Sequence, residues 1–585
     1  MNSLITDNLD LWASAYTQKS SVGRGSNNKL NLHGIKQLRA LILDLAVRGK
    51  LVPQDSNDEP ASVLLEKVAI EKVRLIDEGK IKKQKALPAI TDDEQPFILP
   101  AGWVLVRFED IVDIQSGITK GRKLVGRELE SIPYLRVANV QRGSLDLTEI
   151  KEVEIPVEEK EKYKVKPRDL LITEGGDWDK VGRTAIWSGE LPYIAHQNHV
   201  FKARLFLDEQ SEQWLEMYLN GPIAREYFAG SSKQTTNLAS INKTQLRSCV
   251  IAIPPVEEKN RIVAKVQELM MLCDQLEQQQ ADSITAHETL VDTLLASLAN
   301  SKTVTETTDN WSRIADHFDT LFTTEHSINK LKQTIIQLAV TGKLVPQSST
   351  DESADVLLKS IFAEQSRLFH DEKLKTKAAL SISDEEKYLS VPDSWAFIRL
   401  GNIAKFIDYR GKTPTKQADG IRLITAKNVR FGYISLQPAE FISETEYDSW
   451  MTRGFPRVGD LLFTPEAPLG NVAIIDIDEK FALAQRAICF QLHEKQCAEF
   501  LKLMIMSPVF QQQLQHNATG ITAKGIKAAR LKEIPVPQPP MEEQHRIVSK
   551  VKDLMLLCDQ LVLSIRQSQQ TNMHLADAIV EQALA

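Results

Sequence analysis

Cysteine is scarce in this chain of 585 residues, and the features it lacks narrow the classes of protein to which it can belong. The five cysteines, at 249, 273, 489, 497 and 558, are scattered and form no CxxC pair, which excludes a disulfide framework. No uncharged apolar run approaches the roughly 18 residues that cross a membrane. Residues 1–7 lack the basic and apolar regions of a signal peptide. These absences predict a cytoplasmic globular protein.

An excess of positive charge is also missing. Lysine and arginine number 71 against 78 aspartates and glutamates, which gives a net charge of −7. Hydrophobic residues make up 42% and charged residues 25%, an ordinary balance for a globular protein. Whole-chain electrostatics therefore do not indicate nucleic-acid binding, and any such activity has to come from local basic patches.

Recognisable motifs for catalysis are absent as well. No GxGxxG opens a βαβ unit, and the Gly411-Lys412-Thr413 tripeptide has Phe406 where a phosphate loop needs glycine. His196 and His199 have neither an HExxH glutamate nor a cysteine nearby, so a polar strand or loop is favoured over a metal site. Asp169 and Asp460 each precede a hydrophobic run, where aspartate commonly closes a turn. We predict no catalytic residue, no metal and no cofactor in this chain.

The chain repeats itself at an interval of about half its length. Residues 46–54 (AVRGKLVPQ) and 339–347 (AVTGKLVPQ) agree at eight of nine positions, and residues 254–276 agree with 539–561 at 16 of 23. Weaker pairs lie between them, such as Trp103 with Trp395 and Gln197 with Gln485. The interval far exceeds the roughly 20–50 residues of solenoid repeats, so we interpret the chain as a tandem duplication of one large unit.

Each copy divides into a helical segment, a middle domain and a long helix. Apolar spacings of three and four mark the first helix, and Gly49 and Gly342 fit its C-terminus. Short β-like runs separated by turns make the middle part a mixed α/β domain. The predicted parts are a flexible leader (1–34), helical segments (35–95, 328–390), mixed α/β domains (96–255, 391–540), long helices (256–299, 541–585) and a linker (300–327).

The long helices begin with Pro-Pro-x-Glu-Glu, because prolines in the first turn and acids near the positive helix end are start signals. Apolar residues then alternate at intervals of four and three, which indicates a coiled-coil seam. We expect the two helices to form an antiparallel coiled coil. The seam residues are Ile262, Val266, Leu269 and Leu276 in the first helix, and Ile547, Val551, Leu554 and Leu561 in the second.

Positive charge gathers in loops at corresponding places of the two middle domains. Residues 115–127 hold four basic residues and no acid, and residues 405–416 hold four and one acid. A second basic stretch lies near the end of each domain, at 519–532 and, more weakly, at 233–247. Lys, Arg, Asn and Gln in such loops suit phosphate and base-edge contacts, although a solvated surface remains the alternative for each. The candidate DNA-contacting residues are Lys120, Arg122, Lys123, Arg127, Asn139, Arg142, Arg183, Gln197, Asn198 and Lys243 in the first copy, and Arg410, Lys412, Lys416, Asn428, Arg430, Gln485, Arg486, Lys524 and Lys527 in the second.

The two copies diverge unevenly. Their helical parts match closely, whereas their middle domains barely align. This pattern fits two scaffolds that present equivalent surfaces to equivalent partners, while the two middle domains bind different targets.

Several phrases recur in the same order in both copies. Pro-x-x-Trp opens each middle domain (100–103; 392–395), a glycine loop follows (116–117; 410–414), and Gly459–Phe463 corresponds to Arg168–Ile172. The most specific phrase is Pro-Pro-x-Glu-Glu-x-x-Arg-Ile-Val, present twice. With this ordered double set, the chain resembles the DNA-specificity (S) subunits of Type I restriction–modification systems. The first copy departs from the pattern where Arg168 replaces glycine.

The resemblance implies that each middle domain is a target recognition domain for one half of a bipartite, asymmetric site in double-stranded DNA. The helices would set the spacer between the halves and dock two methylase (M) subunits, and restriction (R) subunits would complete the complex. S-adenosylmethionine, ATP and Mg²⁺ would be held by those partners, which supply adenine-N6 methylation and ATP-dependent cleavage. Two alternatives stay open: a coiled-coil adaptor that binds no DNA, and a catalytic protein with unfamiliar motifs.

Overall fold

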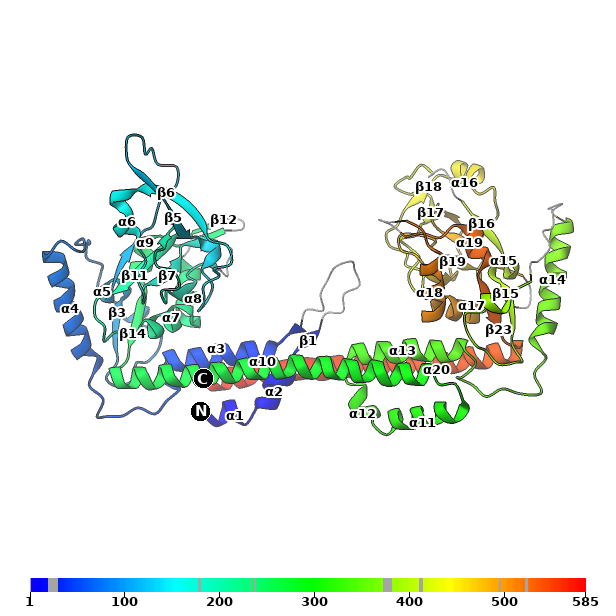
Figure 1. Cartoon of the computed structure of the whole chain (residues 1–585), viewed down its shortest axis with the longest axis horizontal. Coiled ribbons are helices and arrows are strands. Elements are labelled where there is room, and N and C mark those ends of the chain that lie inside the picture. The colour runs from blue at the N-terminus through cyan, green and yellow to red at the C-terminus, as the bar shows by residue number, and fades with distance from the viewer. Residues whose placement is uncertain are drawn as a thin grey trace. The chain divides into compact units, whose positions relative to one another are not determined.

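The computed structural model describes residues 2–18, 30–176, 180–231, 233–235, 238–371, 381–409, 414–493, 496–520 and 524–584. They fall into two compact units, one of Met1–Ser283 with Ser568–Ala585 and the other of Ile284–Gln567 (Figure 1). Each unit holds one mixed α/β domain and parts of both long helices. The duplication predicted from the sequence is confirmed.

The first unit consists of short strands and helices that alternate along the chain, followed by the beginning of a long helix. Its helices are α1 (Asn2–Thr6), α2 (Leu9–Ser14), α3 (His33–Val47), α4 (Ala61–Asp77), α5 (Phe108–Ile111), α6 (Lys160–Tyr163), α7 (Glu212–Asn220), α8 (Pro222–Ser231), α9 (Lys243–Ser248) and the beginning of α10 (Val256–Ala299). Its strands are β1 (Thr17–Gln18), β2 (Leu30–Asn31), β3 (Val104–Arg107), β4 (Val112–Gln115), β5 (Leu129–Leu135), β6 (Lys151–Pro156), β7 (Leu170–Thr173), β8 (Gly175–Gly176), β9 (Thr184–Ile186), β10 (Ala195–His196), β11 (Val200–Leu205), β12 (Lys233–Thr235), β13 (Leu238–Ser240) and β14 (Val250–Ile253).

The second unit repeats this plan. Its helices are α11 (Val304–Ala315), α12 (Phe318–Leu321), α13 (Glu325–Val340), α14 (Ala354–Asp371), α15 (Leu400–Ile403), α16 (Glu444–Trp450), α17 (Ala498–Met506), α18 (Pro508–Asn517), α19 (Ala528–Glu533) and the beginning of α20 (Met541–Leu584). Its strands are β15 (Ala396–Arg399), β16 (Ala404–Asp408), β17 (Ile421–Ile424), β18 (Phe441–Ile442), β19 (Leu461–Phe463), β20 (Val472–Ile474), β21 (Phe481–Leu483), β22 (Ile488–Leu492) and β23 (Pro535–Gln538).

A four-stranded antiparallel sheet forms the centre of each domain. Its strand order is β4-β11-β7-β9 in the first unit and β16-β22-β19-β20 in the second. All residues of β7 and β19 are buried, as expected for apolar runs in the middle of a core. Because neighbouring strands are antiparallel, the loops after β4 and β7 leave the sheet at the same end as the residues that lead into β11 and β9. We call this end, in either domain, the loop end.

Three helices share one apolar cluster beside each domain. In the first unit the cluster joins α3, the beginning of α10 and the end of α20, including Ile262, Val266, Leu269 and Ala576. In the second unit it joins α13, the beginning of α20 and the end of α10, including Val291, Ile547 and Val551. Arg39 of α3 pairs with Asp274 at 2.6 Å, and Lys332 of α13 pairs with Asp559 at 2.5 Å. The beginning of one long helix therefore meets the end of the other, as in an antiparallel pair, and a third helix completes the seam.

The repeated sequence phrases converge on one junction in each unit. Trp103 donates its indole N–H to the buried Glu258 carboxylate at 3.0 Å, and Trp395 donates to Glu543 at 3.0 Å. Burial raises the pKa of both glutamates. Each pair joins the first strand of a domain to the first turn of a long helix.

The repeated GKLVPQ segments, residues 49–54 and 342–347, form part of the same junction. Gly49 and Gly342 end their helices with φ of 68° and 71°, which favours glycine. A Cβ at Gly49 would lie 2.9 Å from the Trp103 ring, and one at Gly342 would lie 3.2 Å from the Trp395 ring. The adjoining loops then pair Asp58 with Arg261 and Asp351 with Arg546, both at 2.6 Å. The phrases recur because together they join the helical segment, the domain and the long helix.

Both connecting segments contain helices that the sequence analysis did not predict. Residues 1–34 are not simply a flexible leader, because α1 and α2 bury Ile5 and Trp12 in the core of the first unit. Most of residues 300–327 form α11 and α12, which bury Ile314 and Leu321. The apolar residues in both segments are too widely spaced among polar ones to stand out by composition alone.

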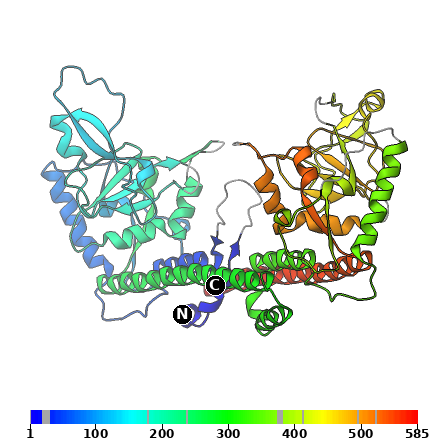
Figure 2. The same cartoon turned by 45° about the vertical axis from the view of Figure 1, so that its right-hand side comes forward.

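The predicted long helices are confirmed to within one residue, as Val256–Ala299 and Met541–Leu584. The second helices of the helical segments flank their own domains: α4 contacts α5, and α14 contacts α15 and β15 (Figure 2). Among the described residues, no helix is both long and apolar enough to cross a membrane.

Replacing Glu258 by Ala should lower the free energy of unfolding by about 2–3 kcal/mol, because the buried indole N–H loses its acceptor and a cavity opens. The matched Glu258→Gln variant keeps an acceptor and should lose less than about 1 kcal/mol. Urea unfolding followed by tryptophan fluorescence measures both losses. Equal losses in the two variants would show that the hydrogen bond does not stabilise the junction.

Candidate nucleic-acid interface

The basic loop that follows β4 is anchored at the loop end of the first domain. Asn198 donates its backbone N–H to the carbonyl of Ile118 at 3.0 Å, and Ile118 forms a β-bridge with Gln197. A Cβ at Gly117 would lie 2.1 Å from the carbonyl oxygen of His196, so glycine is needed for this close approach. The predicted residues of the loops 115–127 and 197–198 are therefore brought together.

Two further segments lie at the same end. The hairpin β12–β13 pairs with β8 directly after β7, and Glu174 binds His199 at 2.5 Å. Arg183, just before β9, donates to the Gln141 side chain at 2.6 Å. The turn that carries Arg142 is fastened here as well, because the Gly143 N–H donates to the carbonyl of Thr184 at 3.0 Å. The first loop end thus gathers segments that lie far apart in the sequence.

Part of the predicted positive charge is already paired. Arg122 binds Glu159 at 2.9 Å, and Arg127 binds Glu158 at 2.6 Å. Lys120 lies over the Tyr134 ring at 4.7 Å, and Lys123 is exposed. The lysines of this loop therefore present charge to solvent more openly than its arginines.

The second loop end is built in the same way. Arg486 binds Glu466 at 2.9 Å, beside a hollow of about 380 Å³ that is also lined by Gln485, Thr519 and Lys527. Lys524 is exposed next to this hollow. Lys416 binds Glu440 at 2.8 Å. Arg410 and Lys412 lie outside the described residues.

Strand register defines which residues of the two loop ends correspond. His196 pairs with Leu135 in the first domain, and Leu483 pairs with Ile424 in the second. Counting onward, Asn198 corresponds to Gln485, and His199 corresponds to Arg486. The predicted pairing of Gln197 with Gln485 is therefore wrong by one residue. The corrected register places an imidazole–carboxylate contact and a guanidinium–carboxylate ion pair at equivalent positions.

The two asparagines predicted to contact DNA have a structural role instead. Asn139 and Asn428 are at most 3% exposed. Each side-chain amide donates to two carbonyls of its own turn at 2.8–3.0 Å, and each side-chain oxygen accepts a backbone N–H. With these groups engaged in the protein, the amides have no capacity for a base edge, so both predictions are wrong for this structure.

Lys243 also lies away from the loop end. It lines a groove of about 440 Å³ beside α4, together with Arg107 and Arg247, and burial lowers the pKa of its ammonium group. Arg430 is exposed, on a turn that also exposes Phe431 and Tyr433. The sequence analysis missed these two aromatic residues, although two aromatics around a glycine were a visible signal.

His196 is a fully buried core residue. Burial and the nearby Lys202 lower the pKa of His196 to about 3, and its Nδ1 lies 2.7 Å from the carbonyl oxygen of Val200. In the described part of the chain, no three His, Cys, Asp or Glu side chains come together as metal ligands would. Asp169 and Asp460 accept the backbone N–H of residues 166 and 457, which confirms that each closes a turn.

The family model and the similar proteins all belong to the specificity subunits of Type I restriction systems. The model of the Type I restriction modification DNA specificity domain matches residues 100–286 and 392–567. The Type I restriction enzyme EcoAI and EcoEI specificity subunits of Escherichia coli are 37% and 35% identical, each over 99% of both chains. A crystal structure of the HsdS subunit from Thermoanaerobacter tengcongensis matches 84% of this chain and 98% of its own, with 16% identity and a TM-score of 0.41.

Replacing Asn428 by Ala should lower the free energy of unfolding by about 1–3 kcal/mol, because two carbonyls of the turn lose the donor that the buried amide supplies. The adjacent exposed Lys427 serves as the matched control, and its Ala variant should change stability by less than about 0.5 kcal/mol. Thermal unfolding of the full chain measures both. A stable Asn428→Ala variant with weakened DNA binding would restore the base-contact hypothesis.

Proposed function

Because the chain belongs to the Type I restriction–modification DNA specificity family, we propose that it recognises DNA and that each mixed α/β domain contacts one half of a bipartite, asymmetric site. This proposal is supported above all by the difference between the two loop ends. Each stands on a four-stranded sheet with the same strand order, yet one presents Asn198 and His199 where the other presents Gln485 and Arg486. One frame with two different sets of polar side chains suits the recognition of two different half-sites.

The charge of the loop ends supports contact with the DNA backbone. Lys120 and Lys123 in the first domain, and Lys524 and Lys527 in the second, are exposed there although the chain carries a net charge of −7. Local lysines attract phosphates regardless of base sequence and so position the protein on the duplex. Base contacts would then come from the neighbouring amide, imidazole and guanidinium groups.

The long helices serve, in this proposal, as the spacer and as the dock for two methylase subunits. Helix α20 exposes Leu556, Leu557 and Leu563, which lie outside the apolar cluster and are at least 55% exposed. Exposed leucines on a rigid helix suit a protein partner of similar character. The 44 residues of each helix span about 66 Å at 1.5 Å per residue, long enough to separate two half-sites.

In this proposal, DNA methylation and cleavage are carried out by the partner subunits. We propose that methylase subunits bring S-adenosylmethionine and adenine-N6 methylation, and that restriction subunits bring ATP, Mg²⁺ and cleavage. This chain would then hold no cofactor and contribute no catalytic residue. Its contribution would be to place those partners on a defined sequence.

The proposed function is tested by methylome sequencing of cells with and without this protein. We expect one bipartite, asymmetric motif to carry adenine-N6 methylation only when the protein is present, because the loop ends of both domains select it. Deletion of residues 1–585 with no change in any methylated motif would contradict the proposal.

A salt titration of the reconstituted complex on DNA tests the placement of the interface. Lys120→Ala and Lys524→Ala should each reduce the slope of log K against log salt by about one, the change expected when one phosphate contact is lost. Lys243→Ala, in the groove beside α4, is the control and should leave the slope unchanged. A reduced slope for the control, or unchanged slopes for both loop-end variants, would place the backbone contacts elsewhere.

A further inference from the structure

Arg168 occupies a left-handed backbone conformation, which favours glycine. Its φ is +74°, and the equivalent position of the second domain is Gly459 with φ +90°. The turn is otherwise the same, since Asp169 and Asp460 close it in the same manner. An arginine in this left-handed conformation is strained, so its side chain has to offset a cost that glycine avoids.

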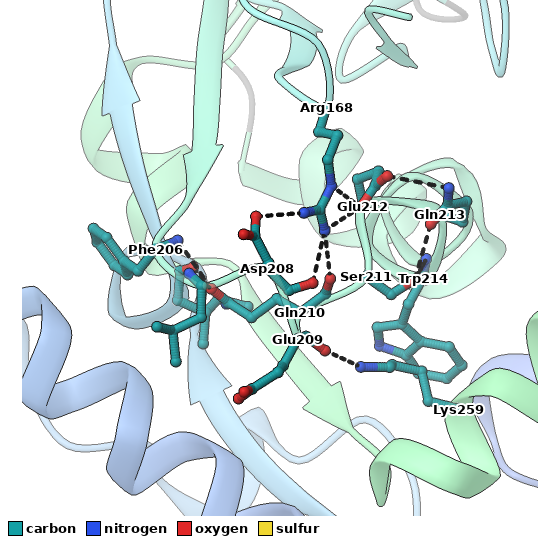
Figure 3. A network of polar contacts seen from close by, with 12 residues as sticks. Arg168, Phe206, Asp208, Glu209, Gln210, Ser211, Glu212, Gln213, Trp214 and Lys259 are labelled. Carbon is teal, nitrogen blue, oxygen red and sulfur yellow. Dashed lines mark hydrogen bonds and ion pairs between the residues drawn. The ribbon is translucent and has the colours of Figure 1, made fainter.

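The guanidinium of Arg168 makes five hydrogen bonds to one short segment and the helix that follows it (Figure 3). Nε and Nη2 donate to Glu212 Oε2 at 3.0 and 2.9 Å, and Nη1 donates to Asp208 Oδ1 at 2.8 Å. Nη2 also donates to the carbonyls of Asp208 and Gln210 at 3.1 and 2.8 Å. We call residues 206–211, which lead from β11 to α7, the connector.

The long helix holds the same connector from its other side. Lys259, in the first turns of α10, is 2% exposed and donates to the carbonyl of Glu209 at 3.1 Å (Figure 3). Gln210 stiffens the segment between the two cations, because it accepts from the backbone N–H of residues 206 and 207 and donates to the carbonyl of Ile111. Arg168 of the domain and Lys259 of the helix therefore hold three consecutive residues between them.

The second unit has a corresponding segment, of which residues 494 and 495 lie outside the described part of the chain. Gln496 donates to the carbonyl of Ile403 at 2.7 Å, as Gln210 does to Ile111. Gly459, Ala498 and Gln544 stand where the first unit has Arg168, Glu212 and Lys259. Gln544 donates instead to Pro539 of its own helix start. The three charged residues thus occur together in one copy and are absent together from the other.

We infer that Arg168 is a positioning residue that fixes the first target recognition domain on helix α10, and so limits the spacer lengths that the protein accepts. The inference rests on the proposed DNA function. Its physical basis is independent of that function: the hydrogen bonds of the Arg168 side chain to the connector offset the backbone strain, and Lys259 joins the connector to the helix. Among the described residues of the second unit, Lys552 of α20 reaches Glu499 of α17 at 3.4 Å in an exposed ion pair, but no charged side chain takes the place of Arg168, Glu212 or Lys259.

The first test follows amide hydrogen exchange in the full chain. Arg168→Gly should speed exchange in residues 206–212 by about threefold to tenfold, the change expected when the net stabilisation lost equals about one ordinary hydrogen bond. Its overall thermal stability should change little, because glycine removes the strain. Lys67→Ala is the matched control: Lys67 reaches the exposed Glu209 carboxylate at 3.9 Å, a contact expected to contribute little. Unchanged exchange in Arg168→Gly would overturn the inference.

The second test measures binding of the reconstituted complex to duplexes carrying its recognised site with the natural spacer, one base pair more and one fewer. Arg168→Gly should lose about threefold of its discrimination against the altered spacers, whereas Arg168→Lys, which retains a donor, should lose less. Lys67→Ala should discriminate as the natural protein does. Full discrimination in Arg168→Gly overturns the positioning role, while failure of the natural complex to select any site would refute the proposed function instead.

Discussion

The structure depends on a carboxylate that is buried and has to be paired. Glu258 and Glu543 lie in the first turn of the long helices, each within hydrogen-bonding distance of a tryptophan that opens a domain. Removing a carboxylate from water is costly unless it is hydrogen-bonded, so the junction favours arrangements that keep each tryptophan N–H on its glutamate. The glycines at 49 and 342 allow the tryptophan rings to approach that closely. Through this junction each domain acquires a defined orientation on its helix.

The same frame supports different loops in the two copies. The central sheets have the same strand order, and their buried strands are apolar in both units. Burial restricts such positions to apolar residues of similar size, whereas loops at the end of a sheet are limited mainly by their turns. Asn139 and Asn428 illustrate the limit, because both stabilise a turn and are the same residue in both copies. The differing residues lie beyond these turns.

Much of the fold could be predicted from the sequence, because helical periodicity and start signals are local. The long helices, the turns closed by Asp169 and Asp460 and the glycine helix ends agree with the structure. Contacts between distant segments could not be predicted in the same way. Whether Arg122 faces DNA or Glu159, and whether an asparagine is exposed or closes a turn, depends on tertiary packing. The helices within residues 1–34 and 300–327 were missed because their apolar residues are few and bind distant partners.

Each long helix ends in the core of the other copy's unit. Ala576 and Ala583 of α20 lie among the apolar residues of the first unit, and Val291 and Leu298 of α10 lie among those of the second. Neither repeat is therefore self-sufficient. A polypeptide shortened to one repeat would leave the apolar residues of α3 or α13 uncovered where the end of the other long helix packs. The end of its own long helix would be free to cover the same residues in a second copy of the polypeptide. The fused gene can thus be viewed as a homodimer whose two subunits were joined and then allowed to diverge.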